Sequence, residues 1–362
     1  MRNATVLRAL SATALLVPAL ALAQGPGDAT AIGLPQFVSY DLTSGGTTKR
    51  ISQFSLPFAV IVPIGQRVSL DVSTAYALSQ VKQGATTVEL NGLTDTQVRA
   101  NFTMLGDAAV VTLGVNVPTG QYAVPDNKLD AAGQIGNDFL VYPVSSYGNG
   151  VAGTGGIAFA KSLGSWNLGV GGTLRKSGEF DAFTTGTQNY RFQPADEYRI
   201  RAGLDRQIGD GSFGLGLTYS AFGDDLADTT TYSTGDRYIG TLNYFLPRER
   251  WDLSISGWDL YRAEGQQVGG TAPYENVANL SATVGFGSGA VRLEPSAEGR
   301  FWQVGGNRAG RLLNAGLRAR LGSELFTVVP AATYSVGTLY SPIDGAATDV
   351  TGFRASLLIR IH

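Results

Sequence analysis

The segment Val291-Arg-Leu-Glu-Pro-Ser-Ala-Glu-Gly-Arg-Phe301 alternates strictly between two kinds of side chain. One parity carries Arg292, Glu294, Ser296, Glu298 and Arg300, and the residues between them are Val, Leu, Pro, Ala, Gly and Phe. A period of two places successive side chains on opposite faces of a β-strand. The segment is therefore predicted to be a strand with one charged face and one apolar face.

The same alternation recurs along the chain, for example in Ser212–Ala221 and Asn276–Phe286. These segments are roughly 10 to 15 residues long, whereas soluble strands average about 5 to 6 and tilted membrane-crossing strands need about 9 to 11. About sixteen segments can be counted, or fourteen if Ile32–Tyr40 and Val151–Lys161 are not strands. The pattern predicts an all-β fold, a transmembrane antiparallel up-and-down β-barrel. A secreted soluble β-sandwich with one solvated face is the alternative.

The connections between these segments alternate in length. Short ones include Pro63–Gln66 and Leu163–Ser165, and long ones include Asp41–Thr48, Lys82–Gly92, Pro118–Asn149, Gly178–Pro194, Phe222–Gly235, Ala263–Glu275, Gly305–Gly310 and Gly337–Asp349. Tight periplasmic turns and long external loops are typical of outer-membrane barrels. We expect both termini in the periplasm and the loop Pro118–Asn149 to form a constriction.

Aromatic residues predict two interfacial girdles around the barrel. Those expected near the short turns are Trp166 and Trp251, and those expected near the long loops are Tyr219, Phe222, Trp258, Tyr261 and Trp302.

The first residues have the features of an export signal. Arg2 and Arg8 are followed by an apolar run and by Ala21-Leu22-Ala23, a small-residue cleavage pattern. The sequence predicts a signal peptide over 1–23, a barrel over 24–362 and location in the bacterial outer membrane, where lipid surrounds it.

Composition excludes several classes of protein. The 362 residues include no Cys and one His, His362, and the formal net charge is −2. Thiol chemistry, His-ligated zinc, a Ser-His-Asp triad and nucleic-acid binding are therefore not expected. We expect no enzyme activity, no cofactor and no metal. Asp224, Asp225 and Asp228 could hold calcium, but a solvated external loop is the simpler interpretation.

The charged residues of the inward parity are the candidate pore-lining set, because a charge pattern along a polar path sets solute selectivity. Mutual pairing that stiffens the wall is the alternative role. The set comprises Asp71, Asp95, Arg99, Arg175, Glu197, Arg199, Arg201, Asp205, Arg237, Arg292, Glu294, Glu298, Arg300, Arg318, Arg320, Arg354 and Arg360.

Two stretches carry a resemblance to a known family. Gly92-Leu-Thr-Asp-Thr-Gln-Val-Arg-Ala-Asn-Phe102, followed after a short turn by Thr112-Leu-Gly-Val-Asn-Val-Pro-Thr-Gly120, resembles the outer-membrane transporters of the MetA-pathway of phenol degradation. That family is similar to long-chain fatty acid transporters, and the resemblance implies uptake of hydrophobic aromatic compounds. The terminal His362 departs from the usual aromatic end of such barrels, and we expect no N-terminal plug before the first strand.

The sequence therefore predicts an outer-membrane channel or transporter for small hydrophobic or aromatic molecules. A general diffusion porin is the alternative function. The sequence leaves open the solute and the oligomeric state.

Overall fold

The computed structural model describes residues 29–121, 123–267, 270–288, 291–322, 326–341 and 344–361. The predicted signal peptide, its cleavage site and His362 lie outside these residues.

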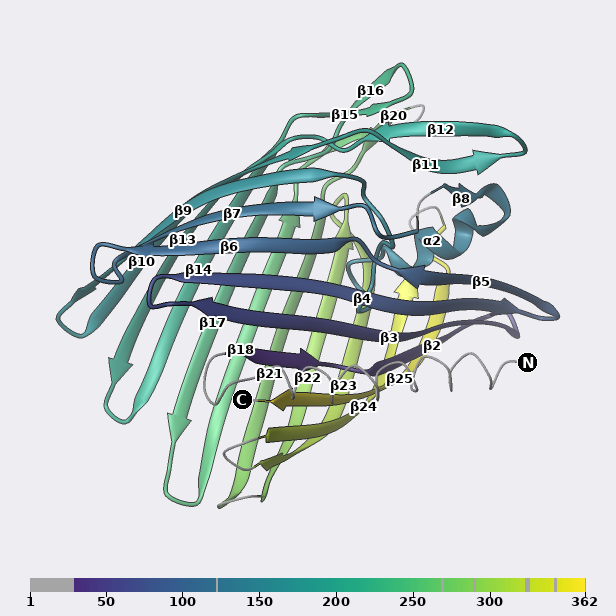
Figure 1. Ribbon diagram of the computed structural model, residues 1–362. Coiled ribbons are helices and arrows are strands. Elements are labelled where there is room, and N and C mark those ends of the chain that lie inside the picture. Colours follow the sequence, from purple (N-terminus) through teal and green to yellow (C-terminus); the bar gives the residue numbers. More distant parts are fainter. Residues whose placement is uncertain are drawn as a thin grey trace.

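The chain forms one closed antiparallel barrel of sixteen crossings (Figure 1). The main sheet contains eighteen strand segments, but β1 and β2 together make one crossing, as do β5 and β6. Segments of the first half are β1 (Thr30–Gly33), β2 (Gln36–Ser44), β3 (Thr47–Ile64), β4 (Val68–Gln83), β5 (Thr86–Leu93), β6 (Thr96–Met104), β7 (Ala109–Val117), β9 (Ala152–Leu163), β10 (Trp166–Ser177) and β13 (Glu197–Ile208). Those of the second half are β14 (Gly211–Phe222), β17 (Arg237–Pro247), β18 (Trp251–Arg262), β21 (Glu275–Ser288), β22 (Val291–Val304), β23 (Asn307–Gly322), β24 (Phe326–Tyr340) and β25 (Ala347–Ile361).

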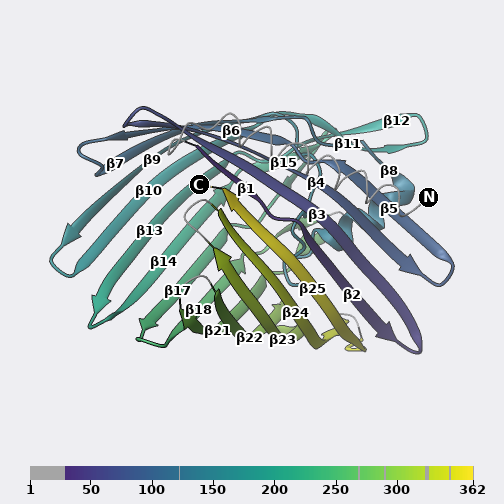
Figure 2. The same cartoon turned by 60° about the horizontal axis from the view of Figure 1, so that its bottom comes forward.

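The last strand pairs with the first, which closes the ring. Figure 2 shows β25 beside β1 and β2, and the register pairs Ala31 with Ile361 and Val38 with Arg354. All sixteen predicted crossings are present, including the two whose period-two alternation is least regular, Ile32–Tyr40 and Val151–Lys161. The predicted fold class is therefore confirmed.

Two crossings are interrupted. The first breaks at Leu34–Pro35, where proline has no N–H to give to the sheet. The fourth breaks at Thr94–Asp95, after Gly92 with a φ of 155°. On either side of this break, β5 and β6 both pair with β4, but only β6 also pairs with β7.

Three of the predicted long loops are instead continued strands with two-residue turns. These are Asp41–Thr48, Lys82–Gly92 and Gly305–Gly310. Gly45 and Gly46 both have positive φ, 56° and 79°, which suits the tight hairpin turn that joins twisted strands. Period-two patterns end where polar residues occupy both faces, so the sequence did not show that pairing continues beyond the apolar band.

Among the described residues, four of the five other long connections contain small elements of their own, and the exception is Gly337–Asp349. β11 (Phe180–Thr185), β12 (Gln188–Gln193), β15 (Asp224–Ala227) and β16 (Thr230–Ser233) form a sheet with β8 (Val124–Pro125), and β19 (Gly265–Gln267) pairs with β20 (Gly270–Ala272). Within this sheet Asp225 accepts the N–H of Ala195 and Asp228 accepts that of Arg191. These carboxylates therefore organise loop backbone.

In the part of the chain that the structure describes, helical structure is limited to η1 (Asp126–Lys128) and α2 (Leu129–Ile135). Among the described residues, no helix is long and apolar enough to cross a membrane.

The outer surface of the barrel is apolar. Leu217, Leu280 and Leu313 are about 56 to 60% exposed, and each lies on the parity opposite the inward residues of its strand, such as Gly216, Asn279 and Asn314. At one end Tyr219, Tyr238, Tyr261 and Tyr274 lie ring to ring, as an interfacial girdle requires. Such a closed barrel with an apolar exterior belongs in the bacterial outer membrane.

Replacing Leu280 with Arg should lower the free energy of unfolding by about 2–4 kcal/mol, because the new cation would face lipid. The measurement is urea unfolding of the barrel in lipid vesicles. Leu280→Ala controls for lost size. Thr283→Arg places the same charge on the opposite face and should cost much less, and an equal loss in both arginine variants would contradict the assignment of faces.

Candidate permeation site

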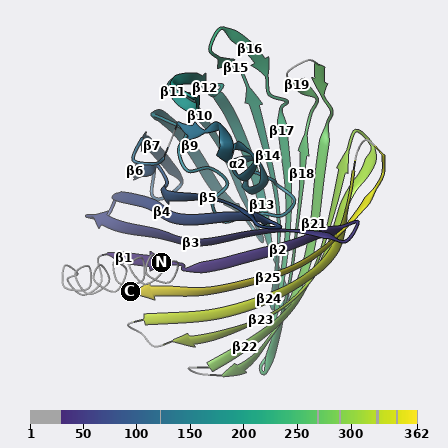
Figure 3. The same cartoon turned by 90° about the vertical axis from the view of Figure 1, so that its right-hand side faces the viewer.

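The segment between β7 and β9 folds into the barrel instead of away from it. We call residues 118–149 the inward loop; its residues Phe139, Leu140, Tyr142, Val144 and Tyr147 are buried. They pack with inward residues of β2, β3, β4, β5, β21, β23 and β25 in the main hydrophobic cluster. Figure 3, which looks toward one end of the barrel, shows α2 inside the outline of the strands, near β5. The predicted position of a constriction thus contains chain that occupies the interior.

Asp95, at the break between β5 and β6, anchors both ends of the inward loop. Its carboxylate accepts the N–H of Gly120 at 3.0 Å and that of Asn149 at 2.7 Å, and it also accepts Nδ2 of Asn116 at 2.8 Å. Its own N–H donates to the carbonyl of Tyr147. A Cβ at Gly120 would lie 2.1 Å from that carbonyl oxygen, so only glycine fits there. Both stretches of the family-like motif, 92–102 and 112–120, meet at this point.

The middle of the loop is held by two walls of the barrel. On the β2–β4 side, the amide of Gln53 donates to the carbonyl of Val144 at 2.7 Å and accepts its N–H at 2.9 Å. Tyr40 Oη donates to the carbonyl of Leu140, and the Tyr147 hydroxyl donates to that of Leu90.

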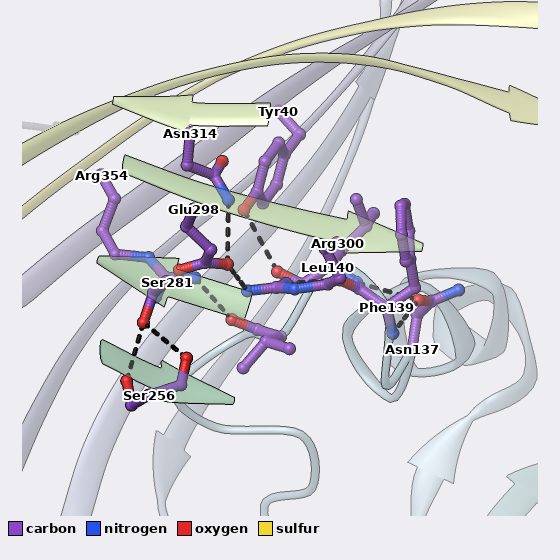
Figure 4. A network of polar contacts seen from close by, with 11 residues as sticks. Tyr40, Asn137, Phe139, Leu140, Ser256, Ser281, Glu298, Arg300, Asn314 and Arg354 are labelled. Carbon is purple, nitrogen blue, oxygen red and sulfur yellow. Dashed lines mark hydrogen bonds and ion pairs between the residues drawn. The ribbon is translucent and has the colours of Figure 1, made fainter. Parts of the chain in front are cut away.

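On the β22–β25 side, arginines from the candidate set bind loop carbonyls (Figure 4). Arg300 donates to the carbonyl of Phe139 at 2.5 Å, and Arg354 donates to that of Val141 at 2.9 Å. The Phe139 ring stacks on Trp302, with ring centroids 5.4 Å apart. The inward loop therefore bridges the interior from one side of the barrel to the other.

Three predicted girdle residues lie on the inward parity of their strands. Trp302 contacts Phe139 and donates its indole N–H to Glu275, and Trp258 packs against the buried cluster under the Arg300 guanidinium. Phe222 pairs with Glu197 across the sheet and lies under the Arg237 guanidinium. The girdle assignment of these three residues was therefore wrong. The available signal was parity, because Trp302 alternates in step with the charged residues of β22.

The predicted lining residues come from nine parts of the wall. They lie on β4 (Asp71), at the β5–β6 break (Asp95), on β6 (Arg99), β10 (Arg175), β13 (Glu197, Arg199, Arg201, Asp205), β17 (Arg237), β22 (Arg292, Glu294, Glu298, Arg300), β23 (Arg318, Arg320) and β25 (Arg354, Arg360). Their lining of a path for solute stays a prediction.

Many of these charges pair with one another along the wall. Arg199 binds Glu197 with a nitrogen–oxygen distance of 2.5 Å, and Arg300 binds Glu298 at 2.5 Å. Near the short-turn end, Arg318 and Arg292 both reach Glu294, and Arg292 also reaches Asp252, which the sequence analysis missed. A Cβ at position 285 would collide with the Arg292 guanidinium, so Gly285 leaves room for the Arg292 side chain to reach Asp252.

Other members of the set remain available. Within the described part of the chain, Arg99, Arg175, Arg201, Arg320 and Arg360 make no ion pair or side-chain hydrogen bond. The interior therefore combines a stiffened, charge-paired wall with free cations.

The wall facing the inward loop borders open space. A cavity of about 560 Å³ lies over β7, β9, β10, β13 and β14, along the inward parity that includes Gly156, Gly169, Gly203 and Gly216. Because glycine has no side chain, this wall leaves free volume beside the packed loop.

Removing the Asp95 carboxylate should release the inward loop. Hydrogen bonds to a charged group are worth roughly 1.5–3 kcal/mol each, so Asp95→Ala should raise loop cleavage by chymotrypsin about tenfold or more in the folded barrel. Asp71→Ala is the matched control, because Asp71 is an interior acid that contacts Asn101 instead of the loop. Equal cleavage of Asp95→Ala and the unaltered protein would show that the carboxylate does not hold the loop.

The Tyr147 hydroxyl should make loop docking sensitive to alkaline pH. Burial raises the pKa of Tyr147 to about 12 from its ordinary 10.0. The raised pKa means that the neutral phenol's contribution is complete below pH 10 and is lost as pH rises to about 12. Chymotryptic cleavage of the loop, corrected for enzyme activity, should rise over this window, and Tyr147→Phe should show a smaller rise. An identical pH profile in the two proteins would remove Tyr147 from the explanation.

No protein-family model and no curated protein matches the sequence. Among solved structures, the chain is similar to the COG4313 outer-membrane channel of Pseudomonas putida F1, with 12% identity over 93% of this chain and 96% of that one and a TM-score of 0.39. It is also similar to OprB of Pseudomonas putida, with 13% identity, coverage of 92% and 94% and a TM-score of 0.44. OccK2 of Pseudomonas aeruginosa, solved with glucuronate, has 9% identity, coverage of 92% and 99% and a TM-score of 0.46.

These similarities are too low to carry an argument about solute or mechanism. The closed ring of sixteen crossings, the apolar exterior and the cavity along a polar interior are features of this chain itself. They identify it as a β-barrel of the bacterial outer membrane.

Proposed function

We propose that the chain is a selective outer-membrane channel for small hydrophobic or aromatic molecules. The observation that carries this proposal is the inward loop, which crosses the interior while the glycine-rich wall of β9, β10, β13 and β14 leaves a cavity beside it. A narrow path over small residues favours compact apolar solutes over large hydrated ones. The resemblance of residues 92–120 to transporters of the phenol-degradation family agrees with this solute class.

Permeation needs no covalent chemistry in this scheme. Solute would enter between the external hairpins, pass the inward loop along the β9–β14 wall and leave at the short-turn end. The ion pairs of the opposite wall keep their charges compensated, which stiffens the barrel without presenting a strong single-sign field. The inward loop then sets the width of the path.

Planar-bilayer conductance of the refolded barrel tests this function. The wild-type channel should show small unitary currents that benzyl alcohol reduces, because the solute occupies the narrow path. Phe139→Ala removes the ring that stacks on Trp302; burying such a ring is worth about 3–5 kcal/mol, so the loop should loosen and conductance should rise several-fold.

The matched control is Phe183→Ala, since Phe183 stacks on Tyr190 in an external hairpin outside the barrel interior. That variant should conduct like the wild type. A large, steady, ohmic wild-type conductance that is indifferent to benzyl alcohol would instead establish a general diffusion porin.

A further inference from the structure

The interior cavity of about 560 Å³ joins two chemically different surfaces. One is a floor of residues without bulky side chains, namely Gly156, Ala158, Ala160, Gly169, Gly171, Gly203 and Gly216. At Gly169 and Gly203 an added Cβ would have no atom closer than 3.8 Å, so these positions border open space. A floor of nearly bare backbone is flat enough for a planar ring to lie against it.

The other surface is cationic. Arg199 and Arg201 line the cavity from β13, on the same parity as Gly203. Thr112, Thr173 and Thr218 add hydroxyl groups, and the one acid in the lining is Asp107, in the turn between β6 and β7. Arg175 lies in register with Glu197, one row beyond Arg199. The cavity is therefore positively charged at its β13 side.

The two lining arginines differ in availability. Nε and Nη2 of Arg199 are held by Glu197, and Nε also contacts the Ser220 hydroxyl. Arg201 is exposed and makes no ion pair or side-chain hydrogen bond among the described residues. Arg199 is thus a fixed neighbour, whereas the whole fork of Arg201 can bind a ligand.

We propose that this cavity is a binding subsite for planar aromatic carboxylates, which rests on the proposed channel function and narrows its solute class. The guanidinium of Arg201 matches a carboxylate in a bidentate arrangement. The ring of the same ligand lies on the glycine floor, and the threonine hydroxyls satisfy the remaining carboxylate lone pairs. The volume of about 560 Å³ lies within the range of small-ligand pockets.

The test measures binding of radiolabelled benzoate to the folded barrel in detergent and the benzoate dependence of single-channel current. Arg201→Gln should raise the half-saturating benzoate concentration tenfold or more in both assays, and Arg201→Lys should recover only part of the loss. Arg320→Gln is the matched control, because Arg320 is an unpaired arginine of the opposite wall. Its benzoate affinity should stay within twofold of the wild type.

Ring recognition is tested separately. Gly203→Leu would place a side chain on the floor and should weaken benzoate binding while leaving chloride conductance measurable. Equal competition by acetate and benzoate would reduce the site to a simple anion site and overturn the proposal, as would unchanged benzoate affinity in Arg201→Gln. An equal loss of benzoate affinity in Arg201→Gln and Arg320→Gln would overturn it too, since the loss of any one positive charge in the interior would then explain the effect.

The two proposals fail in different ways. If benzyl alcohol blocks the wild-type current but Arg201→Gln leaves the benzoate affinity unchanged, only the proposal of a carboxylate subsite is wrong. If neither solute affects a large wild-type conductance, the selective channel is wrong as well.

Discussion

The closure of the sheet between β25 and the first crossing is the constraint on which the rest of the structure depends. Inside lipid, each unpaired backbone N–H or carbonyl costs several kcal/mol, so a sheet can cross only if it has no edge. Pairing of β25 with β1, β2 and β24 satisfies this requirement. Closure also separates two environments, because alternate side chains then face lipid or the interior.

The interruption of the fourth crossing gives the interior its second organising element. Where β5 ends at Leu93, the edge of the wall is met by loop backbone, with the Gln121 N–H donating to the Leu93 carbonyl. Asp95 then collects N–H groups from both ends of the inward loop. A buried carboxylate needs such donors, and the loop ends need an acceptor, so the local break and the folded-in loop stabilise one another.

Charge is distributed unequally around the interior. The β22–β25 wall pairs Arg300 and Arg318 with acids and binds loop carbonyls through Arg300 and Arg354, whereas the β9–β14 wall combines glycine with the available Arg201. The first wall therefore supports the loop, and the second leaves space and unsatisfied donors for a solute. This division of roles follows from which strands the loop packs against.

The sequence by itself determined the barrel, its sixteen crossings and the inward parity, because alternation with period two directly records which face of a strand meets lipid. It did not determine the tight turns at Gly45–Gly46 and Gly305–Gly306, since pairing above the membrane needs no apolar alternation. Only the tertiary structure decided that Trp258 and Trp302 face inward against the loop, that Gln53 is buried against Val144, and that Asp95 binds Gly120 and Asn149. These contacts join residues far apart along the chain, and their partners become neighbours only after the barrel has closed.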